Sequence, residues 1–267
     1  MHTAYLDGRP ATIDDLRALA LANYGHFTSM QVRRRAARGL DLHLRRLREA
    51  TRELFGVALD DARVRSAILA ALDGNGVDDA SVRVTVYSRA FDYAHPDREQ
   101  PVDVLVSLSP PRDAGGRAAW VRTVPFQRPL PHIKHVGTFP LFRLRRQARR
   151  DGFDDALFVD DRGHVSEGTV WNVGFWDGTQ VVWPRAGALR GTTERLLQAG
   201  LAAAGVGQRH EPVEAWRLGA FRAAFAANSS GVWPISGIDE LVMRPDPALM
   251  AALAAALEAQ PWLPLAG

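Results

Sequence analysis

Cysteine is absent from this chain of 267 residues, and lysine is almost absent. Without cysteine the chain cannot form disulfides, thiolate zinc sites, iron–sulfur clusters or a cysteine nucleophile. Lys134 is the single lysine, so nearly every positive charge is an arginine. The excess of basic over acidic residues gives a net charge of only +3, which is too small to predict nucleic-acid binding.

Long apolar runs are also missing. The longest, Ala248–Leu257, is too short to cross a bilayer, and residues 1–10 lack the pattern of a signal peptide. We therefore expect a cytoplasmic protein that binds neither a membrane nor nucleic acid. Hydrophobic residues make up 46% of the chain, which is typical of globular proteins and allows one large domain or two smaller ones.

Helical and strand patterns are mixed along the chain, which predicts an α+β fold. Helices are expected over residues 41–55, 60–72, 139–150 and 192–204, and after Asp246-Pro247. Strands are expected over residues 4–6, 82–87, 102–108, 119–124, 156–159, 173–176 and 181–183. Proline and glycine at 110–116 mark a linker, so we place an N-terminal lobe at 1–112, a linker at 113–118 and a C-terminal lobe at 119–267.

Lys134, in the expected C-terminal lobe, is the first candidate for chemistry. A guanidinium group cannot readily lose a proton and attack a carbonyl to form a Schiff base, whereas a lysine amine can. Lys134 lies between Ile133 and His135, after a proline-rich segment and not on a charged helix face. Burial there would favour the neutral amine that this reaction needs. A leftover surface lysine is the alternative interpretation.

Three further features are weak when taken alone. The segment Leu189-Arg-Gly-Thr-Thr193 opens a helix, where free backbone N–H groups can bind an anion, but ordinary helix starts look the same. The turn Asn228-Ser-Ser-Gly231 is rich in hydrogen-bond donors. Glu167 precedes a glycine at the end of a hairpin strand, where it could hold a protonated ring nitrogen or simply lie at the rim. No metal-binding cluster is recognisable, so no metal is expected.

Together these features resemble the class IV, or fold-type IV, pyridoxal-phosphate enzymes. That family includes branched-chain and D-amino-acid aminotransferases and 4-amino-4-deoxychorismate lyase. The motifs that carry the resemblance are His43-Leu-Arg-Arg-Leu47, Ile133-Lys-His135, Gly163-His-Val-Ser-Glu-Gly168 with Asn172, Leu189-Arg-Gly-Thr-Thr193 and Asn228-Ser-Ser-Gly231. The resemblance implies a two-lobed α+β fold of the D-amino-acid aminotransferase type, a homodimer and pyridoxal 5'-phosphate as cofactor.

The resemblance also implies a role for each motif. Lys134 would carry the cofactor as a Schiff base and then move the proton as base and acid. Glu167 would keep the cofactor's ring nitrogen protonated. The phosphate would be bound by Arg46, Thr192, Thr193, and Asn228 or Ser229. The remaining residues expected at the cofactor are Asn172, Leu189 and Gly191.

Departures from the family pattern concern the substrate. Phe139 stands where branched-chain enzymes carry a tyrosine, and Ser29-Met30-Gln31 replaces an early strand motif. The candidates to face the substrate are Tyr24, Gln31, Arg83 and Phe139.

We expect an aminotransferase that moves an amino group between an amino acid or amine and a 2-oxo acid. The alternative within the family is elimination of pyruvate from aminodeoxychorismate. A third hypothesis is a binding protein without cofactor. The presence of Lys134, Glu167 and Arg46 together argues against it.

Overall fold

The chain folds into two compact units, which we describe separately. The computed structural model describes residues 4–113 and 117–266, so part of the expected linker, 114–116, lies outside the described residues. The first unit comprises Met1–Arg112, Ile133–Gly137 and Pro261–Gly267, and the second comprises Asp113–His132 and Thr138–Gln260. Two segments that we expected in the C-terminal lobe, including the one with Lys134, therefore belong to the first unit.

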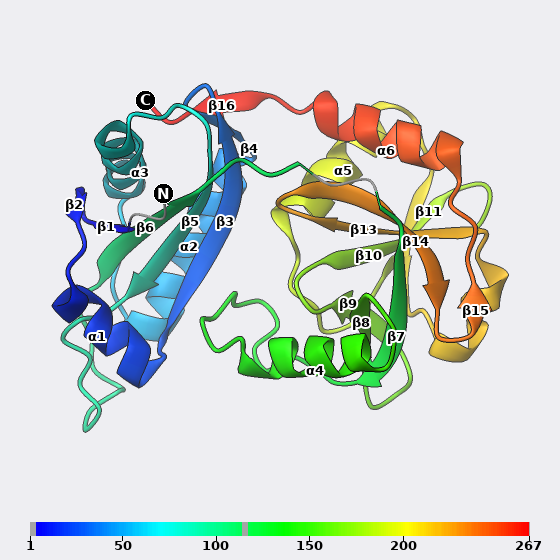
Figure 1. The fold of residues 1–267 in the computed structure, drawn as a ribbon, viewed down its shortest axis with the longest axis horizontal. Helices are drawn as coiled ribbons and strands as arrows, with labels where there is room; N and C mark the ends of the chain where they lie inside the picture. Colours follow the sequence, from blue (N-terminus) through cyan, green and yellow to red (C-terminus); the bar gives the residue numbers. More distant parts are fainter. Residues whose placement is uncertain (1–3, 114–116, 267) are drawn as a thin grey trace. The chain divides into compact units, whose positions relative to one another are not determined.

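The first unit is built on an antiparallel sheet of seven strands in the order β16-β4-β3-β5-β6-β1-β2 (Figure 1). Its strands are β1 (Ala4–Leu6), β2 (Arg9–Pro10), β3 (Gly25–Arg33), β4 (Ala36–Arg38), β5 (Ala80–Tyr87), β6 (Asp103–Ser109) and β16 (Trp262–Pro264). Its helices are α1 (Ile13–Ala22), α2 (Leu40–Phe55) and α3 (Asp61–Asn75). The segment 261–267 joins this unit because β16 pairs with β4.

One face of this sheet forms the core of the first unit. Side chains alternate across a strand, so Met30 of β3 and Val82 and Val84 of β5 point to the same side. They are buried in one cluster with Leu44 of α2 and Ile68 of α3. The apolar stripe predicted for α2 is thus confirmed as its buried face. The opposite face of β3 and β5 carries Gln31 and Arg83, which are described below.

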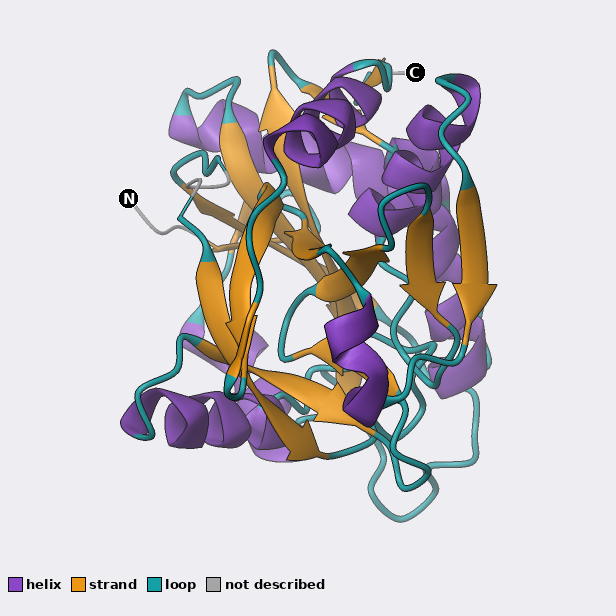
Figure 2. Ribbon diagram, turned by 90° about the vertical axis from the view of Figure 1, so that its right-hand side faces the viewer, coloured by secondary structure: helices purple, strands orange, loops and turns teal. Residues whose placement is uncertain are grey.

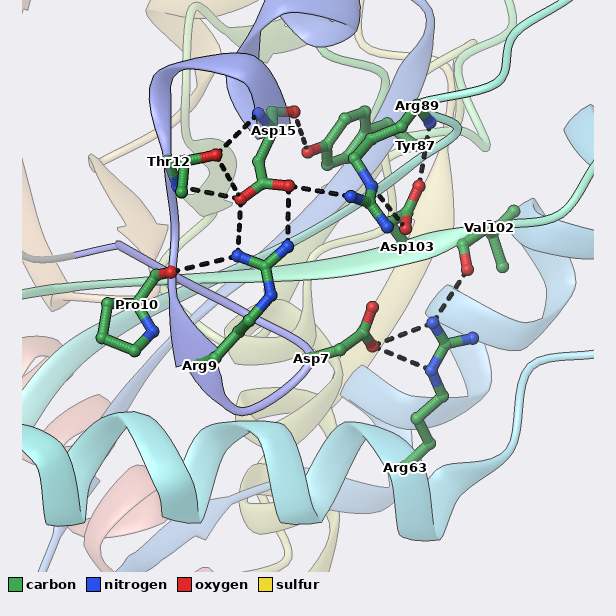
Figure 3. A network of polar contacts seen from close by, with 10 residues as sticks. All are labelled: Asp7, Arg9, Pro10, Thr12, Asp15, Arg63, Tyr87, Arg89, Val102 and Asp103. Carbon is green, nitrogen blue, oxygen red and sulfur yellow. Dashed lines mark hydrogen bonds and ion pairs between the residues drawn. The ribbon is translucent and has the colours of Figure 1, made fainter.

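Helix α1 has no counterpart in the sequence-based prediction. It begins with a capping box, in which the Thr12 hydroxyl accepts from the Asp15 backbone and the Asp15 carboxylate accepts from the Thr12 backbone. The same carboxylate pairs with Arg9 and Arg89, at 2.7 and 2.8 Å (Figure 3). The Tyr87 hydroxyl donates to the Asp15 carbonyl. This network anchors α1, whose apolar side chains are otherwise largely exposed.

The second unit is built on a mixed sheet of nine strands in the order β12-β11-β10-β13-β14-β7-β8-β9, with β15 paired to β14. Its strands are β7 (Ala119–Pro125), β8 (Asp155–Val159), β9 (Val165–Gly168), β10 (Asn172–Trp176), β11 (Val181–Pro184), β12 (Gln208–Glu211), β13 (Ala223–Asn228), β14 (Gly231–Ile238) and β15 (Leu241–Val242). Its helices are α4 (Phe139–Arg150), α5 (Thr192–Ala203), the 3-10 helix η1 (Ala215–Ala220) and α6 (Pro247–Glu258).

Apolar side chains cover the second sheet on both sides. Helices α5 and α6 bury Leu197 and Leu253 in one cluster with Trp183 and Phe225. Helix α4 has the predicted ends and packs on β7 and β8. The strands twist strongly relative to their neighbours (Figure 2). Within the part of the chain that the structure describes, none of the helices combines the length and apolar character needed to span a bilayer.

Candidate active site

The segment with Lys134 is held on the edge of β3 in the first unit. The backbone N–H of Phe27 donates to the Lys134 carbonyl at 2.9 Å, and the N–H of Val136 donates to the Gly25 carbonyl at the same distance. A β-bridge joins His26 and His135. These bonds fix the backbone on both sides of Lys134, so its side chain leaves from a rigid edge and not from a free loop.

Two cations lie over one aromatic ring in this unit. The Lys134 Nζ atom is 4.9 Å from the centre of the Phe27 ring, and the Arg83 Cζ atom is 3.6 Å from it. Arg83 donates through Nε to the Thr85 hydroxyl at 3.3 Å. No carboxylate forms an ion pair with Arg83 among the described residues, and partial burial lowers the pKa of its guanidinium. Such a guanidinium is suited to bind an anionic ligand.

Arg46 lies half-buried on α2, and it is tied to β3 through Thr28. Its guanidinium donates to the Thr28 hydroxyl and lies 3.3 Å from Nδ1 of His43. The Thr28 hydroxyl lies 2.6 Å from the same His43 nitrogen. Burial, with Arg46 and Lys134 nearby, holds the pKa of His43 well below its usual value, so this ring is neutral.

Glu167, on β9 of the second unit, forms a buried ion pair with Arg128. The Arg128 Nε atom lies 2.8 Å from the Glu167 carboxylate, and the two side chains are 4% and 3% exposed. Gly168 follows Glu167 because a Cβ there would lie 1.9 Å from the Trp171 ring. Arg128 thus gives this buried carboxylate a cationic partner within hydrogen-bond distance.

The start of α5, also in the second unit, has the features of an anion site. Gly191 is the N-cap residue and offers no side-chain acceptor to the first turn, which begins with Thr192 and Thr193. Asn172 donates through Nδ2 to the Leu189 carbonyl at 2.7 Å. A Cβ at Gly191 would lie 2.1 Å from Oδ1 of that same amide. Only glycine therefore lets the chain pass Asn172 in this conformation.

The turn between β13 and β14 lies beside this helix start. The Thr193 hydroxyl donates to the Asn228 carbonyl at 2.8 Å. The Asn228 side chain accepts from the Ser230 backbone at 2.8 Å, which shapes the turn that contains Ser229. The structure therefore brings together seven residues of the second unit: Asn172, Leu189, Gly191, Thr192, Thr193, Asn228 and Ser229.

A second buried carboxyl group, Glu194, lies in the first turn of α5. It is 2% exposed, and its Oε1 atom lies 2.7 Å from Arg190. Burial raises the pKa of Glu194 to about 7, an effect that Arg190 only partly offsets. The sequence analysis did not single out this residue.

The four candidate substrate residues occupy different environments. Arg83 and Gln31 lie on the same face of the first sheet, where Gln31 accepts from Ser81 at 2.8 Å. The Tyr24 hydroxyl donates to the Leu54 carbonyl at 3.1 Å, so this group is engaged within the first unit. Phe139 starts α4 in the second unit and is 75% exposed.

Four residues that the sequence analysis did not select also belong to these clusters. They are Phe27, Thr28, His43 and Arg128. His43 stood in a quoted motif, and its spacing of three residues from Arg46 places both on one helical face. Nothing in the sequence distinguishes Arg128 from the other arginines. Across residues 4–113 and 117–266, no group of histidine, aspartate and glutamate side chains is arranged to hold a metal ion.

The sequence matches the model of a family described as amino-transferase class IV over residues 25–238. This range includes every candidate cofactor-binding residue in both units. No functionally curated protein matches the sequence.

Solved structures share the fold at low sequence identity. A branched-chain aminotransferase from Thermoproteus uzoniensis has a TM-score of 0.84 and 18% identity, over 95% of this chain and 93% of that one. A candidate 4-amino-4-deoxychorismate lyase from Legionella pneumophila has a TM-score of 0.80 and 20% identity, over 92% and 94%. A hypothetical aminotransferase from Mycobacterium tuberculosis, in its PLP-bound form, has a TM-score of 0.78 and 19% identity, over 95% and 97%. The predicted α+β, fold-type IV class is confirmed.

Proposed function

Because the chain belongs to the class IV aminotransferase family, we propose that it is a pyridoxal-phosphate-dependent aminotransferase. It moves an amino group between an amino acid or amine and a 2-oxo acid through a Schiff base at Lys134. The observation that carries this proposal is the setting of Lys134. The only lysine of the chain is fixed on the edge of β3, with its ammonium group over Phe27 and with Arg46 in the same unit.

The residues present fit the cofactor in their chemistry. Lys134 supplies the amine for its aldehyde, and Glu167, paired with Arg128, matches its ring nitrogen. The glycine N-cap of α5 provides backbone donors for a phosphate. We propose that the phosphate is bound by Arg46, Thr192, Thr193, and Asn228 or Ser229. Leu189 packs on the ring in this proposal, and Asn172 and Gly191 shape the phosphate turn.

Bound pyridoxal phosphate supplies an electron sink for the pair released at the substrate Cα atom. The protein's own task is then the movement of one proton. The Lys134 amine would take this proton from the substrate Cα atom as a base and would later give it up as an acid. The rigid attachment to β3 keeps the amine in place during both steps.

Arg83 is the residue that we propose for the substrate carboxylate. Its guanidinium has no carboxylate partner among the described residues and lies over the same Phe27 ring as Lys134. A substrate that reacts at Lys134 is therefore within reach of Arg83. Gln31 shares this sheet face, whereas Tyr24 acts through packing. The homodimer, the cytoplasmic location and a substrate role for Phe139 remain predictions.

The test is a half-reaction followed by absorption spectroscopy. The purified protein is loaded with pyridoxal 5'-phosphate and mixed with single amino donors without any acceptor. We expect conversion of the cofactor to pyridoxamine 5'-phosphate and release of a 2-oxo acid, and no multiple turnover in Lys134→Ala. If no donor converts the cofactor and aminodeoxychorismate instead yields pyruvate, the aminotransferase proposal is wrong and the protein is a lyase.

A further inference from the structure

The buried pair Thr28 and His43 lies directly behind Arg46 in the first unit. Thr28 is on β3 and His43 is on α2, so the pair joins the sheet to the helix. Both side chains are buried, at 0% and 3% exposure, whereas Arg46 is half-buried. Neither residue has a role in the proposed function so far.

One assignment of hydrogens makes all three contacts between these residues hydrogen bonds. The guanidinium of Arg46 has no acceptor atoms, so it must donate to the Thr28 hydroxyl. The Thr28 hydrogen then points to His43 Nδ1, 2.6 Å away. The same nitrogen lies 3.3 Å from the Arg46 guanidinium, and in this assignment the ring proton is on Nε2.

A neutral ring is essential to this arrangement. A protonated His43 would carry a hydrogen on Nδ1, lose the acceptor and place a positive charge against Arg46. Burial, Arg46 and Lys134 together hold the pKa of His43 well below its usual value and prevent this change near neutral pH. A neutral ring is therefore able to accept a hydrogen bond beside the Arg46 guanidinium.

We propose that Thr28 and His43 are positioning residues that orient the Arg46 guanidinium for a phosphate ester. The inference rests on the proposed function, in which Arg46 binds the cofactor phosphate. Long arginine side chains lose much rotamer freedom when they bind a ligand, and prior fixation removes that cost.

The experiment compares the dissociation constants of pyridoxal 5'-phosphate and pyridoxal, which lacks the phosphate. The ratio of the two dissociation constants measures how much the phosphate contributes to binding. The bond to Lys134 is common to both compounds, so its contribution cancels. In Arg46→Ala we expect pyridoxal 5'-phosphate to lose most of its advantage in affinity over pyridoxal. In Thr28→Val, which keeps the shape of the side chain, we expect a selective loss of pyridoxal 5'-phosphate affinity of about 10-fold. Thr28→Ser retains the hydroxyl and should restore the wild-type ratio.

A double-mutant cycle separates positioning from a general loss of structure. Thr28→Val in the Arg46→Ala background should have no further effect on the ratio, because the group to be positioned is gone. His43→Leu should reproduce the result of Thr28→Val with a second side chain.

The possible failures are distinguishable. An unchanged ratio in Thr28→Val and His43→Leu, with a collapsed ratio in Arg46→Ala, would overturn the positioning role alone. Equal losses of affinity for pyridoxal and for pyridoxal 5'-phosphate in Thr28→Val and His43→Leu would also overturn the positioning role. An unchanged ratio in Arg46→Ala would overturn the phosphate role in the proposed function, and the inference with it.

Discussion

The Nε atom of Arg128 donates to the Glu167 carboxylate across 2.8 Å, with both side chains almost completely buried. An ion pair in such a place is costly to desolvate, and well-packed apolar residues often provide equal stability. Its presence therefore points to a functional need for a buried negative charge. In the proposed function that need is the protonated ring nitrogen of the cofactor.

Arg128→Met should remove the cationic partner of the buried Glu167 carboxylate. We expect a loss of about 3 to 5 kcal/mol in the free energy of unfolding, measured by urea denaturation. Arg128→Met combined with Glu167→Leu removes both charges and should recover most of that loss. If the double variant is as unstable as Arg128→Met alone, packing and not the unpaired charge is the cause.

Gly191→Ala should disturb the start of α5. The added Cβ would lie 2.1 Å from Oδ1 of Asn172, whose amide is held by the Leu189 carbonyl. Moving this amide breaks a buried hydrogen bond, so we expect a loss of about 1 to 3 kcal/mol in stability. The affinity for pyridoxal 5'-phosphate should fall as well.

Gly219→Ala is the matched control in the same unit. A Cβ at Gly219 meets no atom within 4 Å. The free energy of unfolding of Gly219→Ala should stay within about 0.5 kcal/mol of the wild-type value. A loss in this control similar to that in Gly191→Ala would contradict the steric argument.

The sequence predicted the elements whose signals are local. Helix α4 has both predicted ends, and the cap and proline expected at Asp246-Pro247 begin α6. Helix α1 was missed because Ile13 and Leu21 are 88% and 69% exposed, so only part of its apolar sequence faces the core. Its only signal was the capping box between Thr12 and Asp15.

The candidate site shows the same difference between features with a local signal in the sequence and features that depend on tertiary contacts. The helix-start and turn motifs of the second unit are short and contiguous, so the sequence identified them. The unit to which Lys134 belongs was predicted incorrectly, because it depends on pairing with β3, more than a hundred residues earlier. The partners Thr28 and Arg128 were missed for a similar reason, since only tertiary contacts connect them to Arg46 and Glu167.

Glu194 should make the protein less stable as the pH rises. Its carboxyl group titrates near 4.5 in the unfolded chain and near 7 in the folded one, because burial disfavours the charge. Between these values the folded state binds more protons, so stability falls with increasing pH, by on the order of 3 kcal/mol.

The measurement is urea denaturation of the wild type and of Glu194→Gln at about pH 5 and about pH 8. The neutral amide cannot titrate, so Glu194→Gln should lose less stability between the two conditions. Equal losses in both proteins would show that Glu194 is not the group responsible.

Arg83→Gln should weaken the binding of substrates that carry a carboxylate. The guanidinium lies over Phe27 and has no carboxylate partner among the described residues, so its removal leaves no internal charge unpaired. A hydrogen bond to a charged group contributes about 1.5 to 3 kcal/mol, so we expect KM for an amino acid to rise by about 10- to 100-fold. The KM for simple amines without a carboxylate should show almost no change.

Arg83→Lys keeps the charge but not the planar group that stacks on the ring, so its KM for an amino acid should lie between those of the wild type and Arg83→Gln. Arg146→Gln, at an exposed position of α4, is the control for a general loss of positive charge. An equal rise in KM for amines and amino acids in Arg83→Gln would mean that Arg83 does not contact the carboxylate.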